Sequence, residues 1–154
     1  GGRVAVVTGG AGAIGFGIAY NKDLFDQAGL DADNPPADWD SFMAACDKLK
    51  SSGVQPIGAG VKDGFFGEWY LVNSLTQNLD SPADALNLFI GNLDWREPRY
   101  HEHWVKLEDL YKAGYINDDV NSLQLYQGIQ LMQTKKAAIL SARCRLGLYS
   151  PRSR

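Results

Sequence analysis

Residues 20–30 read Tyr-Asn-Lys-Asp-Leu-Phe-Asp-Gln-Ala-Gly-Leu, and this run defines a junction between two elements of secondary structure. The apolar segment before it, residues 14–20, carries little charge and stops at Asn21, which indicates a buried strand. The apolar residues that follow lie on one side of a short amphipathic helix: Leu24, Phe25 and Ala28. Gly29 stands where a left-handed C-cap is expected. The pattern predicts a strand that leads directly into a short helix.

Helices and strands continue to alternate after this junction. Asp38 can cap a second helix, whose apolar residues recur at steps of three and four: Trp39, Phe42, Met43, Cys46 and Leu49. Residues 51–53 close this helix, and residues 54–60 have the composition of a short buried strand that runs into a loop. Residues 81–84 supply a cap, a proline at the first helical position and an acid, which predicts another helix start.

Two further helices and a strand are expected in the C-terminal half. Residues 100–113 form a helix with the apolar residues Tyr100, Trp104, Leu107, Leu110 and Tyr111. Ser122 can cap the next helix, which carries Leu125, Tyr126, Ile129 and Met132. The order predicts an α/β fold in which about five or six helices flank a short mixed sheet. The strands are expected near residues 4–7, 14–20, 54–59 and 136–140.

Composition narrows the class of protein. A chain of 154 residues with 45% hydrophobic and 21% charged residues is typical of one soluble globular domain. Four of its 15 Lys and Arg residues lie in the last twelve positions, so residues 1–142 carry 11 bases against 18 acids. An acidic body argues against a nucleic-acid surface. We expect residues 1–141 to form the domain and residues 142–154 a basic tail that is disordered or non-native. Cys46 and Cys144 form no disulfide framework.

Several phrases, taken together, resemble the extracellular solute-binding proteins of ABC sugar importers. In the order of that family, they are the phrase at 20–25, Trp39-Asp40, Gly53-x-x-Pro56-Ile57, Lys62-Asp63-Gly64-Phe65, residues 113–117 and Lys136-Ala137-Ala138. The resemblance covers roughly residues 14–140. It implies a fold of the periplasmic-binding-protein type II-like class. It also implies a single lobe, because the segment corresponds to the middle of such a chain.

The resemblance implies carbohydrate binding rather than catalysis, with no cofactor and no catalytic residue. The partners would be a small carbohydrate and an ABC permease, and the location would be periplasmic or otherwise extracytoplasmic. No secretory signal follows Gly1-Gly2-Arg3. Loss of the second lobe is expected to impair binding and to expose a face of the lobe through which copies self-associate.

Residues 62–70 hold the candidate ligand-binding residues. Stacking on a sugar ring needs flat apolar faces, and its hydroxyls need convergent polar groups. Residues of both kinds occur here, and we predict that Lys62, Asp63, Phe65, Phe66 and Trp69 bind the ligand. In the family, the aromatic after Lys-Asp-Gly, here Phe65, lies near the cleft. Phe65 or Phe66 could instead fill the core, and the spacing of Trp69 with Val72 and Leu75 also fits the inner face of a helix.

A glycine-rich run offers an alternative function. Residues 8–15 (Thr-Gly-Gly-Ala-Gly-Ala-Ile-Gly) follow an apolar run and are similar to the NAD(P)-binding loop of short-chain dehydrogenases, so Gly9–Gly15 could hold a dinucleotide. Such a fold needs a helix after the loop, and Gly17 weakens one. The dehydrogenases also use a catalytic Tyr-x-x-x-Lys, whereas none of the seven tyrosines here has a lysine four positions later. The sequence therefore favours a glycine-rich loop before a strand.

Metal binding is not expected. His101 and His103 lie two apart on a predicted helix, so their side chains point in nearly opposite directions. Trp95 could be an aromatic at the rim of a site or a packing lid, and the sequence leaves both open. The chain contains no nucleophile elbow and no phosphate-binding Gly-Lys-Ser/Thr loop.

Overall fold

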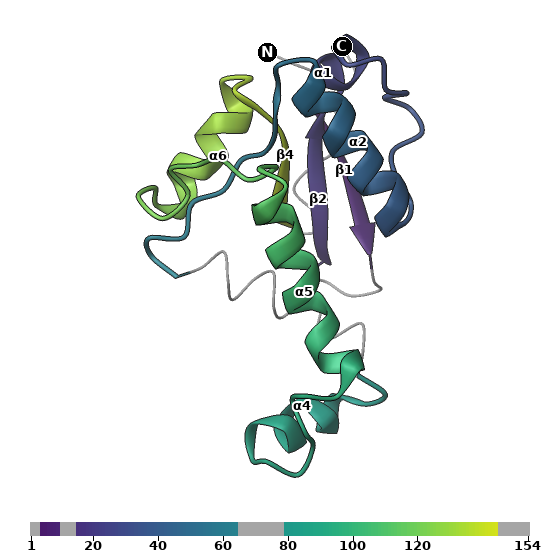
Figure 1. Ribbon diagram of the computed structural model, residues 1–154, viewed down its shortest axis with the longest axis vertical. Helices are drawn as coiled ribbons and strands as arrows, with labels where there is room; N and C mark the ends of the chain where they lie inside the picture. Colours follow the sequence, from purple (N-terminus) through teal and green to yellow (C-terminus); the bar gives the residue numbers. More distant parts are fainter. Residues whose placement is uncertain (1–3, 10–14, 65–78, 145–154) are drawn as a thin grey trace.

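One mixed sheet organises the fold in the computed structural model, which describes residues 4–9, 15–64 and 79–144 (Figure 1). In chain order the elements are β1 (Val4–Gly9), β2 (Gly15–Asn21), α1 (Lys22–Gln27), α2 (Trp39–Ser51), β3 (Gln55–Ile57), α4 (Pro82–Phe89), α5 (Pro98–Lys112), α6 (Leu125–Gln133) and β4 (Ala137–Cys144). The strand order is β1-β2-β4-β3. This confirms the predicted α/β fold with a short mixed sheet, and every predicted strand segment is present.

The direction of the strands follows from the connections between them. β1 and β2 are antiparallel with Val4 opposite Asn21, and β2 and β4 are antiparallel with Gly15 opposite Cys144. β3 runs parallel to β4, with Ile57 opposite Ile139. Parallel neighbours need a long crossover connection, and the chain between β3 and β4 includes helices α4, α5 and α6.

The junction between β2 and α1 forms as predicted. Asn21 is 2% exposed, and its side-chain oxygen accepts the backbone N–H groups of Asp23 and Leu24 at 3.0 and 3.3 Å. It therefore ends the strand and caps the helix at the same time. Gly29 has a φ of +72°, the left-handed conformation expected of the C-cap region.

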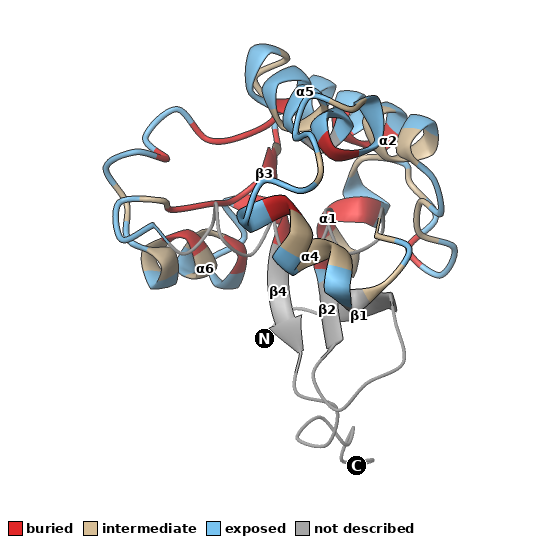
Figure 2. Cartoon of the chain, turned by 90° about the horizontal axis from the view of Figure 1, so that it is seen from below, coloured by how far each residue is buried: buried red, intermediate tan, exposed pale blue. Residues whose placement is uncertain are grey.

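The two faces of the sheet pack against different helices. Tyr20 and Ile139 are opposite each other and belong to the main core, which includes residues of α1, α2 and α5. Their neighbours Ala19 and Leu140 point to the other face, where they pack with Met132 of α6. Figure 2 shows the buried residues in red on β3 and on parts of α2 and α5. Strands β2 and β4 therefore sit between helices on both faces.

The expected apolar face of α5 is only partly buried. Tyr100 and Leu110 are 0% and 4% exposed. Trp104 and Tyr111, which the sequence grouped with them, are 43% and 56% exposed. The sequence pattern gave all of these residues as apolar positions of one helix, and the structure buries some of them and leaves others partly exposed.

Two further expectations need correction or refinement. Ser122 does not cap α6, which begins after Gln124, and the N–H of Leu125 is instead taken by Asp63. β4 runs to Cys144, so residues 142–144 pair with β2 in the sheet, beyond the boundary expected at residue 141. Residues 145–154 lie outside the described ranges.

No helix within the described residues combines the length and the apolar character that crossing a membrane requires.

Candidate functional site

The loop that follows β3 carries Lys62 and Asp63 and is held by hydrogen bonds to the second half of the chain. Four backbone N–H groups donate: Gly58 to Ile139 O (2.9 Å), Ala59 to Asn117 Oδ1 (2.8 Å), Val61 to Val120 O (3.0 Å) and Lys62 to Leu123 O (3.0 Å). Asn117 is 7% exposed and also donates to Asp119. These hydrogen bonds fix the backbone of the loop from Gly58 to Lys62.

Two glycines allow this loop to lie directly on α6. A Cβ added to Gly60 would lie 2.2 Å from Gln124 O, and one added to Gly128 would lie 2.6 Å from Ala59 C and Gly60 N. No side chain fits at these separations. Gly60 and Gly128 are therefore required for the close approach of the loop and the helix.

The predicted ligand residues fall into two groups. Lys62 and Asp63 lie in the described loop and both are exposed. The Asp63 carboxylate accepts the N–H of Leu125 at 3.1 and 3.2 Å, so it caps α6. Phe65, Phe66 and Trp69 lie outside the described residues.

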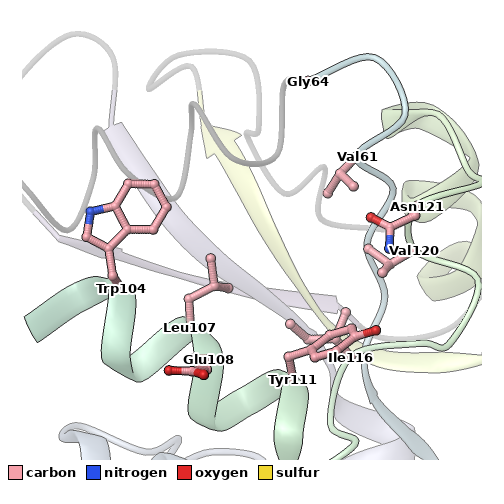
Figure 3. Close-up of a pocket in the computed structure, with 9 residues that line it drawn as sticks. All are labelled: Val61, Gly64, Trp104, Leu107, Glu108, Tyr111, Ile116, Val120 and Asn121. Carbon is pink, nitrogen blue, oxygen red and sulfur yellow. The ribbon is translucent and has the colours of Figure 1, made fainter.

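A hollow of about 520 Å³ lies beside this loop (Figure 3). We call it the α5 hollow, and its lining residues within the described ranges are Val61, Gly64, Trp104, Leu107, Glu108, Tyr111, Ile116, Val120 and Asn121. Figure 3 shows Trp104 and Leu107 projecting from α5 into the same space, towards the loop that contains Val61 and Gly64. The hollow thus brings α5 together with the loop that the sequence singled out.

Residues of α5 form one wall of the hollow at helical spacing. Trp104, Leu107, Glu108 and Tyr111 occupy positions i, i+3, i+4 and i+7, and so share a face. Sequence reasoning listed the two aromatics among the apolar residues of this helix and assigned them to no site. Glu108 was the available signal for this site. A charged residue within an apolar stripe indicates that this face of the helix is exposed to solvent.

The lining is mostly apolar and carries little charge. Of the lining residues named above, Glu108 alone is charged, and it pairs with Lys112 of the next turn at 2.7 Å. The hydrogen bond from Lys112 lowers the pKa of the Glu108 carboxyl below its usual range. Asn121 contributes an amide. The arrangement therefore suits a ligand with an apolar face and hydrogen-bonding groups.

The described residues do not support the alternative sites. The glycine-rich region lies between the antiparallel strands β1 and β2, so a strand follows it where a dinucleotide fold needs a helix. Within the described ranges, no cluster of three or more His, Cys, Asp and Glu residues could hold a metal. Trp95 donates its ring N–H to Leu88 O at 3.0 Å and contacts Phe89 edge-on, which is a packing role.

Comparison with known proteins identifies the family. Residues 6–142 match the family described as bacterial extracellular solute-binding protein, and the chain belongs to it. This confirms the resemblance drawn from the sequence. The family is one of binding proteins rather than enzymes, and the dehydrogenase alternative finds no support.

Individual relatives are much longer than this chain. It is 32% identical over 131 residues to the sn-glycerol-3-phosphate-binding periplasmic protein UgpB of Escherichia coli (strain K12), which covers 80% of this chain and 29% of the relative. The UgpB of Rhizobium meliloti (strain 1021) is 34% identical over 103 residues, 63% of this chain and 23% of the relative. A solved chitin oligosaccharide binding protein is 30% identical, with a TM-score of 0.72, over 89% of this chain and 34% of its own. The chain thus spans about a third or less of each of these proteins.

Proposed function

We propose that this chain forms part of the receptor of an ABC importer and binds a carbohydrate in the α5 hollow. The observation that carries the proposal is the presence of two half-exposed aromatic side chains, Trp104 and Tyr111, on the wall of that hollow. Large apolar side chains left partly exposed beside a cavity are typical of ligand sites. The C–H face of a pyranose ring matches a flat aromatic ring, and the sugar hydroxyls match a few polar groups at its edge.

Polar groups on the described lining suit the hydroxyls. The Asn121 amide can both donate and accept, and the Glu108 carboxylate can accept. Lys62 and Asp63 lie on the adjoining loop, and we include them, with Phe65, Phe66 and Trp69, among the proposed ligand contacts. The family resemblance of the Lys62-Asp63-Gly64-Phe65 phrase supports this part of the proposal.

The charge of the lining supports a neutral sugar over a phosphorylated ligand. The names of the relatives reported above state that UgpB binds sn-glycerol 3-phosphate and that the solved protein binds chitin oligosaccharide. A phosphate is usually held by Arg, Lys or helix N-termini. The described lining of the α5 hollow carries an acid, Glu108, and the one base among the described residues of the proposed site is Lys62 on the adjoining loop. A neutral glycan avoids the repulsion that a phosphate would meet from Glu108.

The proposed partners follow from the family. An extracellular solute-binding protein passes its ligand to a membrane permease, so we propose an ABC permease as the protein partner and a location outside the cytoplasm, in the periplasm. We also propose self-association through a face of the lobe. The exposed apolar residues Leu86, Phe89 and Ile90 at the C-terminal end of α4 support it, since large exposed apolar side chains often mark a contact with a partner.

Calorimetric titration tests the ligand proposal. The chain is titrated with chitin oligosaccharides, other neutral oligosaccharides, sn-glycerol 3-phosphate and NAD. We expect saturable binding of a neutral glycan, and Trp104→Ala should raise its Kd at least about tenfold because the stacking face is lost. Tyr126→Ala is the control, since Tyr126 is likewise a partly exposed aromatic, at 56% against 43% for Trp104, but lies on α6 outside the lining. Saturation by NAD alone, or equal Kd values for both variants, would contradict the proposal.

A further inference from the structure

Asp63 is followed by Gly64, and no other Asp or Asn residue of the chain is followed by glycine. In such a pair the backbone nitrogen of the glycine can attack the side-chain carboxyl carbon of the residue before it, because glycine has no Cβ to hinder the approach. Both residues are exposed, and Gly64 has a φ of +80°. Gly64 also lines the α5 hollow (Figure 3). The pair therefore lies at the surface of the loop that carries the predicted ligand residues.

The reaction open to this pair forms a succinimide, and water is its only co-reactant. The bond that forms joins Gly64 N to Asp63 Cγ, and the bond that breaks joins Cγ to the hydroxyl of the protonated carboxyl group. The amide proton and this hydroxyl leave together as water. Hydrolysis then returns a water: addition at Cγ restores aspartate, and addition at the backbone carbonyl carbon of Asp63 gives isoaspartate. No oxidant or reductant takes part.

Two hydrogen bonds hold the reacting groups in the folded chain. The Asp63 carboxylate accepts the N–H of Leu125 at 3.1 and 3.2 Å, and the Gly64 N–H donates to Val61 O at 2.8 Å. Succinimide formation removes the proton of Gly64 N and one oxygen of the carboxyl group. The bond to Val61 is then lost, and the bond to Leu125 keeps at most one of its two acceptor atoms. The reaction therefore follows a local opening of the loop from α6.

Serine follows two other aspartates, Asp40 and Asp80, and both positions are less favourable. The serine side chain hinders the attacking nitrogen, which glycine leaves free. The Asp80 carboxylate pairs with Arg99 at 2.7 Å. After Asp40, the Ser41 N–H donates to the cap of α2 at 2.8 Å, within a regular helix start. Asp63 is consequently the position at which the reaction is expected first.

Isoaspartate at position 63 would separate the loop from α6. The backbone would run through Cβ and Cγ of this residue, which lengthens the chain by one methylene group. The carboxylate that remains as the side group would sit directly on Cα. In the native chain Asp63 caps a helix that begins 62 positions away, so the position of its carboxylate is critical. The modification would therefore remove the link between the loop and the helix.

We infer that Asp63-Gly64 is a site of isoaspartate formation and that the hydrogen bond from Leu125 controls its rate. When the bond is made, the carboxyl group is held on α6. When the loop opens, the carboxyl group is free to react with Gly64 N. The rate is then proportional to the population of the open loop, which a single exposed hydrogen bond can change severalfold. This chemistry belongs to the chain itself and does not depend on the proposed ligand.

Incubation of the full chain in warm buffer, followed by peptide mapping with mass spectrometry, tests the inference. Succinimide is lighter than aspartate by one water, and isoaspartate is distinguished from aspartate by its fragments. We expect both products at Asp63, and more of them there than at any other aspartate. Asp63→Glu is the control, since its longer side chain would have to close a larger ring, and it should give neither product at this position.

Leu125→Pro tests control by the cap. Leu125 is the first residue of α6, where proline is favoured, and Gln124 before it is already extended, with φ −74° and ψ 162°. The substitution removes the N–H that Asp63 accepts, so the rate at Asp63 should rise at least about threefold. Asn21→Ala is the matched control, because it removes a cap at the distant β2–α1 junction and should leave the rate unchanged.

The outcomes separate the possible causes. Absence of both products at Asp63, or equal rates in wild type and Leu125→Pro, would overturn the inference. An equal acceleration by Asn21→Ala would show that general loss of stability controls the rate, and the role of the cap would be wrong. Circular dichroism checks that each variant is folded. Glycan titration of fresh wild-type chain tests the ligand proposal separately, since the mapping of the products requires no ligand.

Discussion

The carboxylate of Asp63 accepts the backbone N–H of Leu125, the first residue of α6, at 3.1 and 3.2 Å. A residue 62 positions away in the sequence thus serves as the helix cap that is normally local. At the same helix end, the side-chain oxygen of Gln127 accepts the N–H of Gln124 at 2.8 Å. The site loop and α6 are consequently one structural unit.

Replacement of Asp63 should therefore affect stability as well as binding. We expect Asp63→Ala to lower the free energy of unfolding by about 1 kcal/mol, the usual cost of a lost N-cap. Asp63→Asn should cost less, because its amide oxygen still accepts. Lys62→Ala is the control on the same loop. Urea unfolding measures all three, and equal midpoints for Asp63→Ala and Lys62→Ala would show that the cap is unimportant.

Gly128 offers a test of the close approach between α6 and the site loop. Alanine in a helix interior is normally stabilising relative to glycine by about 1 kcal/mol. Here its Cβ would lie 2.6 Å from Ala59 C and Gly60 N, so we expect Gly128→Ala to destabilise by about 1–3 kcal/mol. Gln130→Ala, at an exposed position of the same helix, should change little. A more stable Gly128→Ala variant in thermal unfolding would refute the contact.

Asn21 should be important for the β2–α1 junction. Its buried side chain accepts two backbone N–H groups that no other residue of the helix can satisfy. We expect Asn21→Ala to cost about 1–2 kcal/mol of stability, and Asn21→Asp to cost less because aspartate caps equally well. Gln27→Ala, at the exposed last residue of α1, serves as the reference in chemical denaturation.

Stability should fall in alkaline solution through two buried groups. Burial raises the pKa of the Cys46 thiol from 9.0 to about 12, with the charge of Asp47 adding to it. Burial, and then the hydrogen bond to Asp47, raises the pKa of Tyr115 from 10.0 to about 12. The unfolded chain loses these protons at lower pH than the folded chain. The stabilisation is therefore complete below about pH 9 and is lost between about pH 9 and pH 12.

Unfolding measured across that pH range checks the assignment. Tyr115→Phe should flatten the fall above pH 10, because phenylalanine has no proton to lose. Cys46→Ala should flatten it from pH 9 upward. The slopes are compared rather than the absolute stabilities, since each substitution also changes packing. Parallel curves for wild type and both variants would assign the alkaline loss to other groups.

Most of the fold could be predicted from the sequence because its signals are local. The Asp38 cap was predicted, and its carboxylate accepts the Ser41 N–H at 2.8 Å. Gly29 and Gly53 end helical segments with φ values of +72° and +80°. Each of these features depends on residues within three or four positions, so a short window of sequence contains the whole interaction. The same holds for the β2–α1 junction.

The site was harder to predict because it depends on residues far apart in the chain. An aromatic at helical spacing looks the same in sequence whether a core or a hollow lies beside it, so the sequence did not place Trp104 and Tyr111 in a site. Ser122 looked like a cap, and the cap is Asp63. A local sequence pattern cannot show that a residue distant in the sequence caps the helix.

The sequence by itself determined the class of fold, the order of its elements and the family, since caps, apolar periodicity and short phrases are properties of neighbouring residues. Only the tertiary structure decided that β4 extends to Cys144, that the site loop lies on α6 and that two aromatics of α5 face a hollow. These features arise from pairing and packing between segments brought together by folding, and their energy depends on distance in space rather than on separation along the chain.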